Sequence, residues 1–180
     1  MRLGRGAGTD LDRLGGGAVL IRRATAADRD AITALHVASW QDSYGIELPL
    51  EVLRDDVPGY LEAKWAARRL APPELVLVAG DGAGDLAGFV CALADRDPPL
   101  IDNLHVRPDG RGAGTGGRLL RAAREALAAE GFRGAYLTVL ERNPRALRFY
   151  LREGGADEGP LEETLMGRPV RTRRIGFALR

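Results

Sequence analysis

Cysteine, histidine and lysine are scarce in this chain of 180 residues, which has one cysteine, Cys91, two histidines and a single lysine. One cysteine cannot form an internal disulfide, which fits a reducing compartment and predicts a cytoplasmic location. Cys91 stands within an apolar strand pattern, so we expect a buried, inert thiol rather than a nucleophile. Two histidines and one cysteine far apart in the sequence do not predict a zinc or iron site.

Long apolar runs and an excess of either charge are also lacking. No segment approaches the roughly twenty apolar residues that cross a membrane, and 26 basic residues nearly balance 25 acidic ones. The composition predicts a globular protein that binds neither nucleic acid nor a membrane. Residues 1–17 carry arginine and glycine without an apolar core, so we expect a disordered tail rather than a signal peptide, followed by one domain over residues 18–180.

The remaining sequence alternates strand and helix patterns. Strands are predicted at residues 18–23, 75–79, 86–94, 100–106, 135–140, 156–159 and 170–179. Helices are predicted after Thr25, which forms a capping box with Asp28, over 50–70 with an interruption at Pro58, over 115–130, and after Asn143. Short loops make most strand pairs antiparallel, whereas the crossover helix makes 100–106 and 135–140 parallel. The pattern predicts a mixed α/β (α+β) fold.

The most informative stretch, residues 100–120, reads as a strand, a glycine-rich turn and the start of a helix. Four of the six residues from 112 to 117 are glycine, namely Gly112, Gly114, Gly116 and Gly117. Such a turn leaves backbone N–H groups pointing out of the helix start, where the dipole adds about half a positive charge. These features predict a phosphate site, to which Arg111 can add a bidentate contact.

Two nucleotide-binding patterns compete for this turn. It is not a Walker loop, because no Gly-Lys-Ser/Thr closes it. Gly112-x-Gly114-x-x-Gly117 does satisfy the dinucleotide pattern, with Glu141 as a ribose-binding acid. Five residues separate the strand from the first glycine, however, and only about sixty residues remain to complete a dinucleotide fold. A nucleotide-binding oxidoreductase is therefore kept as a rival hypothesis.

Two motifs resemble those of the GNAT (Gcn5-related N-acetyltransferase) superfamily. Arg111-x-x-Gly114-x-Gly116 is similar to its pyrophosphate loop, and Asn143-x-x-Ala146-x-x-Phe149-Tyr150-x-x-x-Gly154 looks like its second motif. The order of the predicted elements is similar as well, so that the resemblance covers the chain from about Val19 to Leu179. It implies a single-domain acyl-CoA N-acyltransferase fold, with helices on both faces of a mostly antiparallel sheet.

The resemblance also implies where acetyl-CoA, the acetyl donor, would bind. The pyrophosphate would sit on the N–H groups of residues 112–117, Thr115 included, beside Arg111. Pantetheine would pair with the backbone from Leu104 to Val106, and the N–H of Val106 would hold the oxyanion. Arg142, Arg145 and Arg148 either reach the 3′-phosphate or form a solvated surface.

Individual residues are assigned on the same resemblance. Tyr150 would be the general acid, because a phenol with a pKa near 10 can protonate a leaving thiolate. Asn143 would contact the cofactor, cap its helix, or do both. Trp40 and Tyr44 either form the acceptor wall or belong to the core, whereas His36 is expected to pack in the core.

The general base is the least determined residue, because the strand 100–106 lacks the glutamate that several relatives have there. Asp102 and His105 are the polar substitutes. Strict alternation would place Asp102 with Leu104 and Val106 on one face, and His105 with Ile101 and Asn103 on the other.

The sequence as a whole predicts an N-acetyltransferase that transfers acetyl directly to a primary amine of a small molecule or peptide. No cysteine is placed to carry a covalent acetyl group. The rivals are a non-catalytic acyl-CoA sensor and the oxidoreductase. Relatives form homodimers through their C-terminal strands, so a homodimer is an expectation of the resemblance alone.

Overall fold

The computed structural model describes residues 19–80, 85–108 and 112–180, so the predicted tail and Arg111 lie outside the described residues. The elements are β1 (Leu20–Arg23), η1 (Ala26–Asp28), α1 (Arg29–Ser43), η2 (Val52–Asp56), α2 (Val57–Ala67), β2 (Glu74–Gly80), β3 (Leu86–Leu93), β4 (Leu100–Val106), α3 (Thr115–Ala129), β5 (Gly134–Leu140), α4 (Pro144–Arg152), β6 (Ala156–Leu165) and β7 (Arg168–Ala178).

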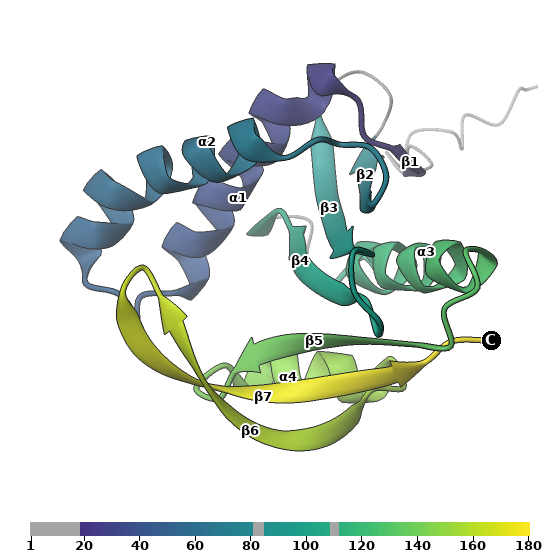
Figure 1. The fold of residues 1–180 in the computed structure, drawn as a ribbon. Coiled ribbons are helices and arrows are strands. Elements are labelled where there is room, and N and C mark those ends of the chain that lie inside the picture. Colours follow the sequence, from purple (N-terminus) through teal and green to yellow (C-terminus); the bar gives the residue numbers. More distant parts are fainter. Residues whose placement is uncertain (1–18, 81–84, 109–111) are drawn as a thin grey trace, which may run out of the picture.

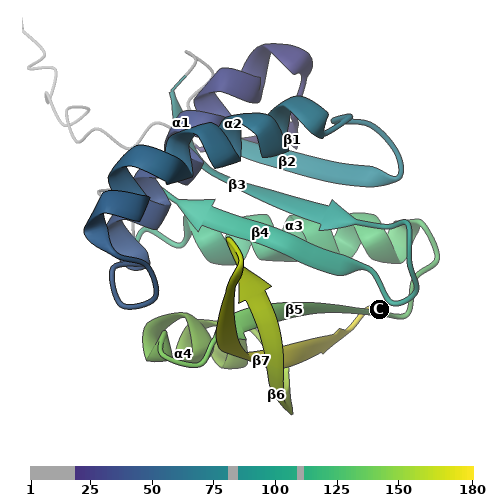
Figure 2. The ribbon, with the colours of Figure 1, turned by 60° about the vertical axis from the view of Figure 1, so that its left-hand side comes forward.

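All seven strands form one mixed sheet in the order β1-β2-β3-β4-β5-β7-β6. Every neighbouring pair is antiparallel except β4 and β5, which are parallel. Helices α1 and α2 cover one face of the sheet, and α3 and α4 cover the other (Figures 1 and 2). The predicted fold class is confirmed, including the parallel pair and the helices on both faces.

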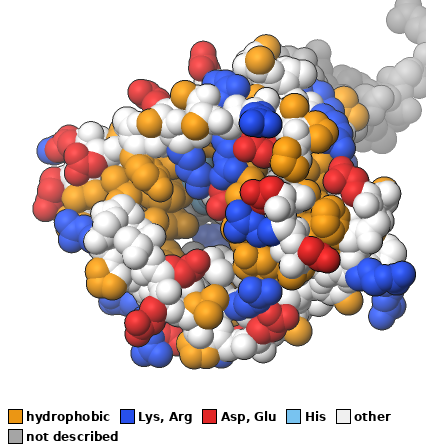
Figure 3. Space-filling model, in the orientation of Figure 1, with side chains coloured by type: hydrophobic (Ala, Val, Ile, Leu, Met, Phe, Trp, Pro, Cys, Tyr) orange, Lys and Arg blue, Asp and Glu red, His pale blue; other side chains and the backbone are white. Residues whose placement is uncertain are grey.

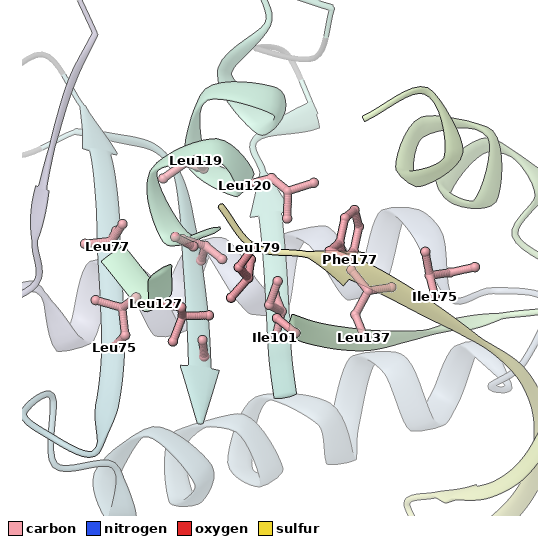
Figure 4. Close-up of a cluster of buried hydrophobic side chains, with 14 of the residues drawn as sticks. Leu75, Leu77, Ile101, Leu119, Leu120, Leu127, Leu137, Ile175, Phe177 and Leu179 are labelled. Atoms are coloured by element: carbon pink, nitrogen blue, oxygen red, sulfur yellow. The ribbon is translucent and has the colours of Figure 1, made fainter. Parts of the chain in front are cut away.

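The core between α3 and the sheet follows from the helical spacing of apolar residues. Leu119, Leu120, Ala123 and Leu127 recur at intervals of three and four, and all four are fully buried. Figure 4 shows three of these leucines pointing at Leu75, Leu77 and Ile101 of the sheet, with Ile175 and Phe177 of β7 alongside. This packing fixes the start of α3 relative to the end of β4.

The opposite face has two smaller clusters. Trp65 of α2 and Phe89 of β3 meet at 5.2 Å between ring centroids in a cluster that includes Cys91. Cys91 is fully buried, as predicted, and burial raises the pKa of its thiol to about 12. The second cluster, which we call the Trp40 cluster, consists of Trp40, Leu48, Leu53, Val57 and Leu61, and it joins α1, η2 and α2.

Two predicted elements differ from the structure. Pro58 does not interrupt α2, because it stands in the first helical turn, where a missing N–H costs nothing. The irregular part of this helical region lies directly before α2, in the wide π-type turns of η2. The last hairpin is much longer than predicted, since β6 runs to Leu165; Gly159, at a bulge, and Pro160 interrupt its strand pattern.

The capping box at the start of the first helix is present as predicted. The Asp28 carboxylate accepts hydrogen bonds from the backbone N–H and the hydroxyl of Thr25, at 2.7 and 2.9 Å. Arg22 donates two further bonds to it, both at 2.7 Å. These bonds, with that of Arg22 first in size, hold the pKa of Asp28 well below its usual range.

We expect Asp28→Asn to lower the free energy of unfolding by about 1 to 2 kcal/mol at neutral pH, because the amide cannot replace all four contacts. The lowered pKa means that the contribution of Asp28 is complete above the usual pKa of about 3.9 and is lost as the pH falls below it. Urea unfolding at pH 7 and pH 3 should therefore show a difference that shrinks in acid. Asp30→Asn, an exposed change in the same helix, is the control, and an equal loss there would contradict the assignment.

Candidate active site

A cleft opens where the sheet divides between β4 and β5. The two strands share one residue pair, Leu100↔Tyr136, and beyond it no described strand pairs with this side of β4. A cavity of about 1130 Å³ occupies the division. Its walls are β4 and β5, the first turn of α3, α4, the ends of α1 and α2, and the β6–β7 hairpin. Figure 3 shows its mouth as the hollow between α2 and the hairpin.

A bulge at Asp102 determines which side chains of β4 share a face. Asn103 pairs with Cys91, and Ile101 pairs with the next residue of β3, Ala92, so Asp102 is the extra residue. Asp102 contacts α2 and His105 contacts α1, whereas Ile101 and Leu104 pack on the α3 side. The predicted alternation is therefore wrong, because it assumed an unbroken period of two. The two candidate bases lie on the same face.

Two cations hold the carboxylate of Asp102. Arg68 Nη2 lies 2.5 Å and Lys64 Nζ 3.1 Å from the same oxygen, Oδ2. Arg68 also pairs with Glu74 at 3.6 Å. All of these side chains are largely buried, with at most 21% of each exposed. Asp102 therefore serves as the anion of a charge network that ties β4 to α2.

His105 is held by a different set of contacts. Its Nδ1 lies 2.8 Å from the hydroxyl oxygen of Ser39 in α1, and its ring centroid is 4.4 Å from that of His36. His36 is fully buried and accepts a hydrogen bond at Nδ1 from the indole of Trp65, at 3.0 Å. Burial, and then the nearby His105, lower the pKa of His36, so it stays neutral. The prediction that His36 packs in the core is confirmed.

The start of α3 has the geometry of an anion site. Gly112 and Gly114 adopt φ values of +92° and +80°, which other residues rarely adopt, and both stand in open space. No described side chain caps the first turn, so its N–H groups remain available to a ligand in the cavity. At Gly117, in the first turn of α3, an added Cβ would lie 2.9 Å from the Glu153 carboxylate, the mobile end of a side chain at the end of α4.

Helix α4 brings Asn143 and Tyr150 to the cavity. The Asn143 side chain accepts a hydrogen bond at 3.0 Å from the N–H of Ala146, so it caps the helix as predicted. Burial, with a smaller contribution from Tyr44, raises the pKa of Tyr150. Burial also raises the pKa of Tyr44 to about 12. Both residues line the cavity, Tyr44 from the end of α1 and Tyr150 from α4.

An aromatic wall lies beside this pair. Tyr44 stacks on Trp40 with 4.7 Å between ring centroids, and Tyr60 of α2 lies 5.9 Å from Trp40 on another side. Trp40 is only 4% exposed, yet all three residues line the cavity. The two roles weighed for Trp40 and Tyr44, core and cavity wall, are therefore both present.

Sequence reasoning missed several residues that line the cavity. Ser39 and Lys64 belong to the walls, and so do hairpin residues such as Leu165 and Thr172. Ser39 could have been found, because it stands one helical turn after His36 and beside Trp40. The hairpin residues carried no motif. Arg145 and Arg148 also line the cavity, together with Arg118, Arg121 and Arg152, whereas Arg142 does not.

The residues that the structure describes, 19–80, 85–108 and 112–180, contain neither a metal-ligand cluster nor a membrane-spanning helix. No group of three or more histidine, cysteine, aspartate or glutamate side chains in these ranges could hold a metal ion. None of the helices in the described part of the chain is long and apolar enough to cross a membrane.

Known proteins resemble this chain in sequence and in fold. The Acetyltransferase (GNAT) family matches residues 29–155. YuaI of Bacillus subtilis, an uncharacterized N-acetyltransferase, is 27% identical over 164 residues, 88% of this chain and 91% of its own. A GCN5-related N-acetyltransferase from Rhodopseudomonas palustris superposes with a TM-score of 0.73 at 23% identity, over 89% of this chain and 96% of its own. PaiA N-acetyltransferase from Thermoplasma acidophilum, solved with coenzyme A, superposes at 0.69 and 17% identity, over 87% and 98%.

The divided sheet and the uncapped helix start at its cleft define an acyl-CoA-dependent N-acyltransferase. With the family match over most of its length, the chain belongs to the GNAT family of acetyltransferases, and acetyl-CoA is its acetyl donor. The resemblance inferred from the two sequence motifs is confirmed, and the nucleotide-binding oxidoreductase is set aside.

We expect Gly114→Ala to lower the free energy of unfolding by about 1 to 2 kcal/mol, because a Cβ is strained at this positive φ. Gly114→Asn should lose less, since asparagine tolerates the left-handed conformation better. Gly45→Ala is the control, because Gly45 has open space and no positive φ. The three variants can be compared by urea unfolding, and equal stability of Gly114→Ala and wild type would contradict the strain.

Proposed function

We propose that this acetyltransferase moves the acetyl group from acetyl-CoA directly to a primary amine, with both bound in the cleft at once. The observation that carries the proposal is that one cavity contains the unpaired side of β4, the uncapped start of α3, a buried phenol and a histidine. The amine nitrogen forms a bond to the thioester carbon as the bond from carbon to sulfur breaks. One proton leaves the amine, and one reaches the sulfur.

The unpaired side of β4 suits the peptide-like pantetheine arm. The N–H of Arg107 donates to the carbonyl of Ala87 on β3, at 2.9 Å. Because successive N–H groups of a strand point in opposite directions, the N–H of Val106 points away from β3, toward the cleft. It is the donor we assign to the developing oxyanion, with Leu104 in the same orientation for the arm. The pyrophosphate then reaches the first turn of α3, Thr115 included, with arginines of α3 and α4 at the same end.

Tyr150 supplies the proton to the departing sulfur. Its raised pKa keeps the phenol protonated throughout the physiological range. The thiol that forms has a pKa near 8.5, by analogy with cysteine, which is below that of the phenol. Tyr150 therefore stabilises the developing thiolate by donating a hydrogen bond, and the proton that it passes to the sulfur is replaced from water. Cys91 is fully buried and is not among the residues that line the cavity, which supports direct transfer without a cysteine as acetyl carrier.

His105 is the better of the two candidate bases. Asp102 already accepts contacts from Lys64 and Arg68, and a proton on its carboxylate would remove the anion that faces Lys64 and leave Arg68 with Glu74 alone. His105 lines the same cavity, its Nδ1 contacts the hydroxyl of Ser39, and it is the group that we assign to proton exchange with the amine. An imidazole also has the right basicity for this step near neutral pH.

Tyr150→Phe should lower kcat by about a hundredfold or more, with the affinity for acetyl-CoA nearly unchanged, because only the proton donor is lost. Tyr44→Phe is the matched variant, since it removes another buried phenol from the same cavity. We expect it to raise KM for the amine more than it lowers kcat. Thiol release measured with a panel of primary amines gives both constants. Equal kcat in wild type and Tyr150→Phe would remove Tyr150 as the acid, and tight acetyl-CoA binding with no turnover of any amine would favour the acyl-CoA sensor.

The two base candidates should respond differently to substitution. His105→Gln removes the base, and we expect kcat to fall by about a hundredfold with a small change in stability. Asp102→Asn should instead cost about 1 to 3 kcal/mol of unfolding free energy, because it leaves two cations facing a neutral amide, while kcat falls much less. Thermal unfolding and initial rates on the same preparations separate the two. The reverse pattern would assign the base to Asp102.

A further inference from the structure

The β6–β7 hairpin extends well beyond the sheet that supports it. Strand β7 pairs with β5 as far as Leu140↔Thr172. Pairing between β6 and β7 continues from Glu162↔Arg171 to Leu165↔Arg168, where β5 has already ended. We call residues 162–171 the hairpin arm. Figure 1 shows the arm reaching toward the ends of α1 and α2. Two strands alone are marginally stable in water, so the arm depends on what its tip contacts.

The tip has an unusual turn residue. Met166 and Gly167 lie between the last paired residues, with φ values of +48° and +76°. Two positive φ values in a two-residue hairpin loop favour Asn-Gly, and a long side chain at the first position is strained. A methionine at this position indicates that contacts of its side chain offset the unfavourable backbone conformation.

The compensating interaction is contact with the opposite wall of the cleft. Leu165 and Met166 pack against the Trp40 cluster of α1, η2 and α2, and Tyr44 packs on the same cluster. Both tip residues are half-buried, whereas Glu162 to Thr164 of the arm are exposed. The arm is therefore attached at both ends, to β5 through its strands and to the helices through its tip. Leu165 and Val170 contribute the part of the cavity wall in between.

A docked arm restricts which amines reach the acetyl group. An internal lysine of a polypeptide would bring extended chain on both sides of it, which requires a groove open at both ends. The tip packs on the Trp40 cluster, as Tyr44 does, so an extended chain cannot pass between the arm and the helices without displacing the tip. We infer that the acceptor is a small-molecule amine of narrow cross-section, and that Met166 keeps polypeptide lysines out by holding the arm on the Trp40 cluster. This inference rests on the proposed transfer function.

The test compares two acceptors in wild type and in Met166→Asn. Asparagine suits the turn, so the hairpin should persist while the apolar contact is lost. The probes are n-butylamine and a lysine heptapeptide with blocked termini. Wild type should favour n-butylamine in kcat/KM, and Met166→Asn should raise the ratio of peptide to butylamine by about tenfold, the scale of one lost apolar contact. Met166→Leu keeps an apolar side chain and should retain the wild-type ratio.

Hydrogen exchange provides a readout that does not depend on turnover. In Met166→Asn the amides of the arm should exchange faster, while those of residues 173–178 stay protected by β5. Met166→Gly, which also suits the turn, gives the same comparison if the asparagine variant is unstable. An unchanged acceptor ratio in a folded variant, or a wild type that prefers the peptide, would overturn the inference. A wild type that binds acetyl-CoA and acetylates no amine would instead overturn the transfer function, and the acceptor class with it.

Discussion

The separation of β4 from β5 is the constraint on which the rest of the structure depends. A continuous sheet would pair the two strands along their whole length and leave no cavity. Here the pairing stops after Leu100↔Tyr136. Backbone groups left unpaired inside a protein cost free energy, so such a division persists only where a ligand can complete the pairing and where other contacts hold the halves apart. The structure supplies the contacts that hold the halves apart, because α3 and α4 share a core on one face and the hairpin tip joins the helices on the other.

The division also explains why two charge arrangements coexist in one cavity. Arginines of α3 and α4 line the cavity that also contains the start of α3, where the helix dipole favours an anion. On the β4 wall of the same cavity, Asp102 is matched by Lys64 and Arg68. Under the proposed function, the anionic cofactor would bind at the helix start and the amine would meet this charge-compensated wall.

The parts that could be predicted from the sequence are those determined by local chemistry. Helical spacing predicted the buried face of α3, and the glycines predicted the turn before it. The Asn143 cap and the capping box at Thr25 were predicted from residue types that hydrogen-bond to the backbone at helix starts. The bulge at Asp102 could not be predicted, because it depends on how β4 matches β3 and leaves no signature in β4 alone. For the same reason, the shared face of Asp102 and His105 emerged only from the register.

The hairpin was missed for a related physical reason. Residues 160–165 include proline, glutamates and a threonine in an exposed edge strand, so they lack the apolar alternation that would predict a strand. Their order comes from pairing with β7 and from a tip that packs on residues more than a hundred positions earlier in the chain. Local sequence patterns predict the elements that bury a regular apolar face, such as α3. The wall of the cleft formed by α1, α2 and the hairpin arm is built instead from segments that gain their structure by packing on one another.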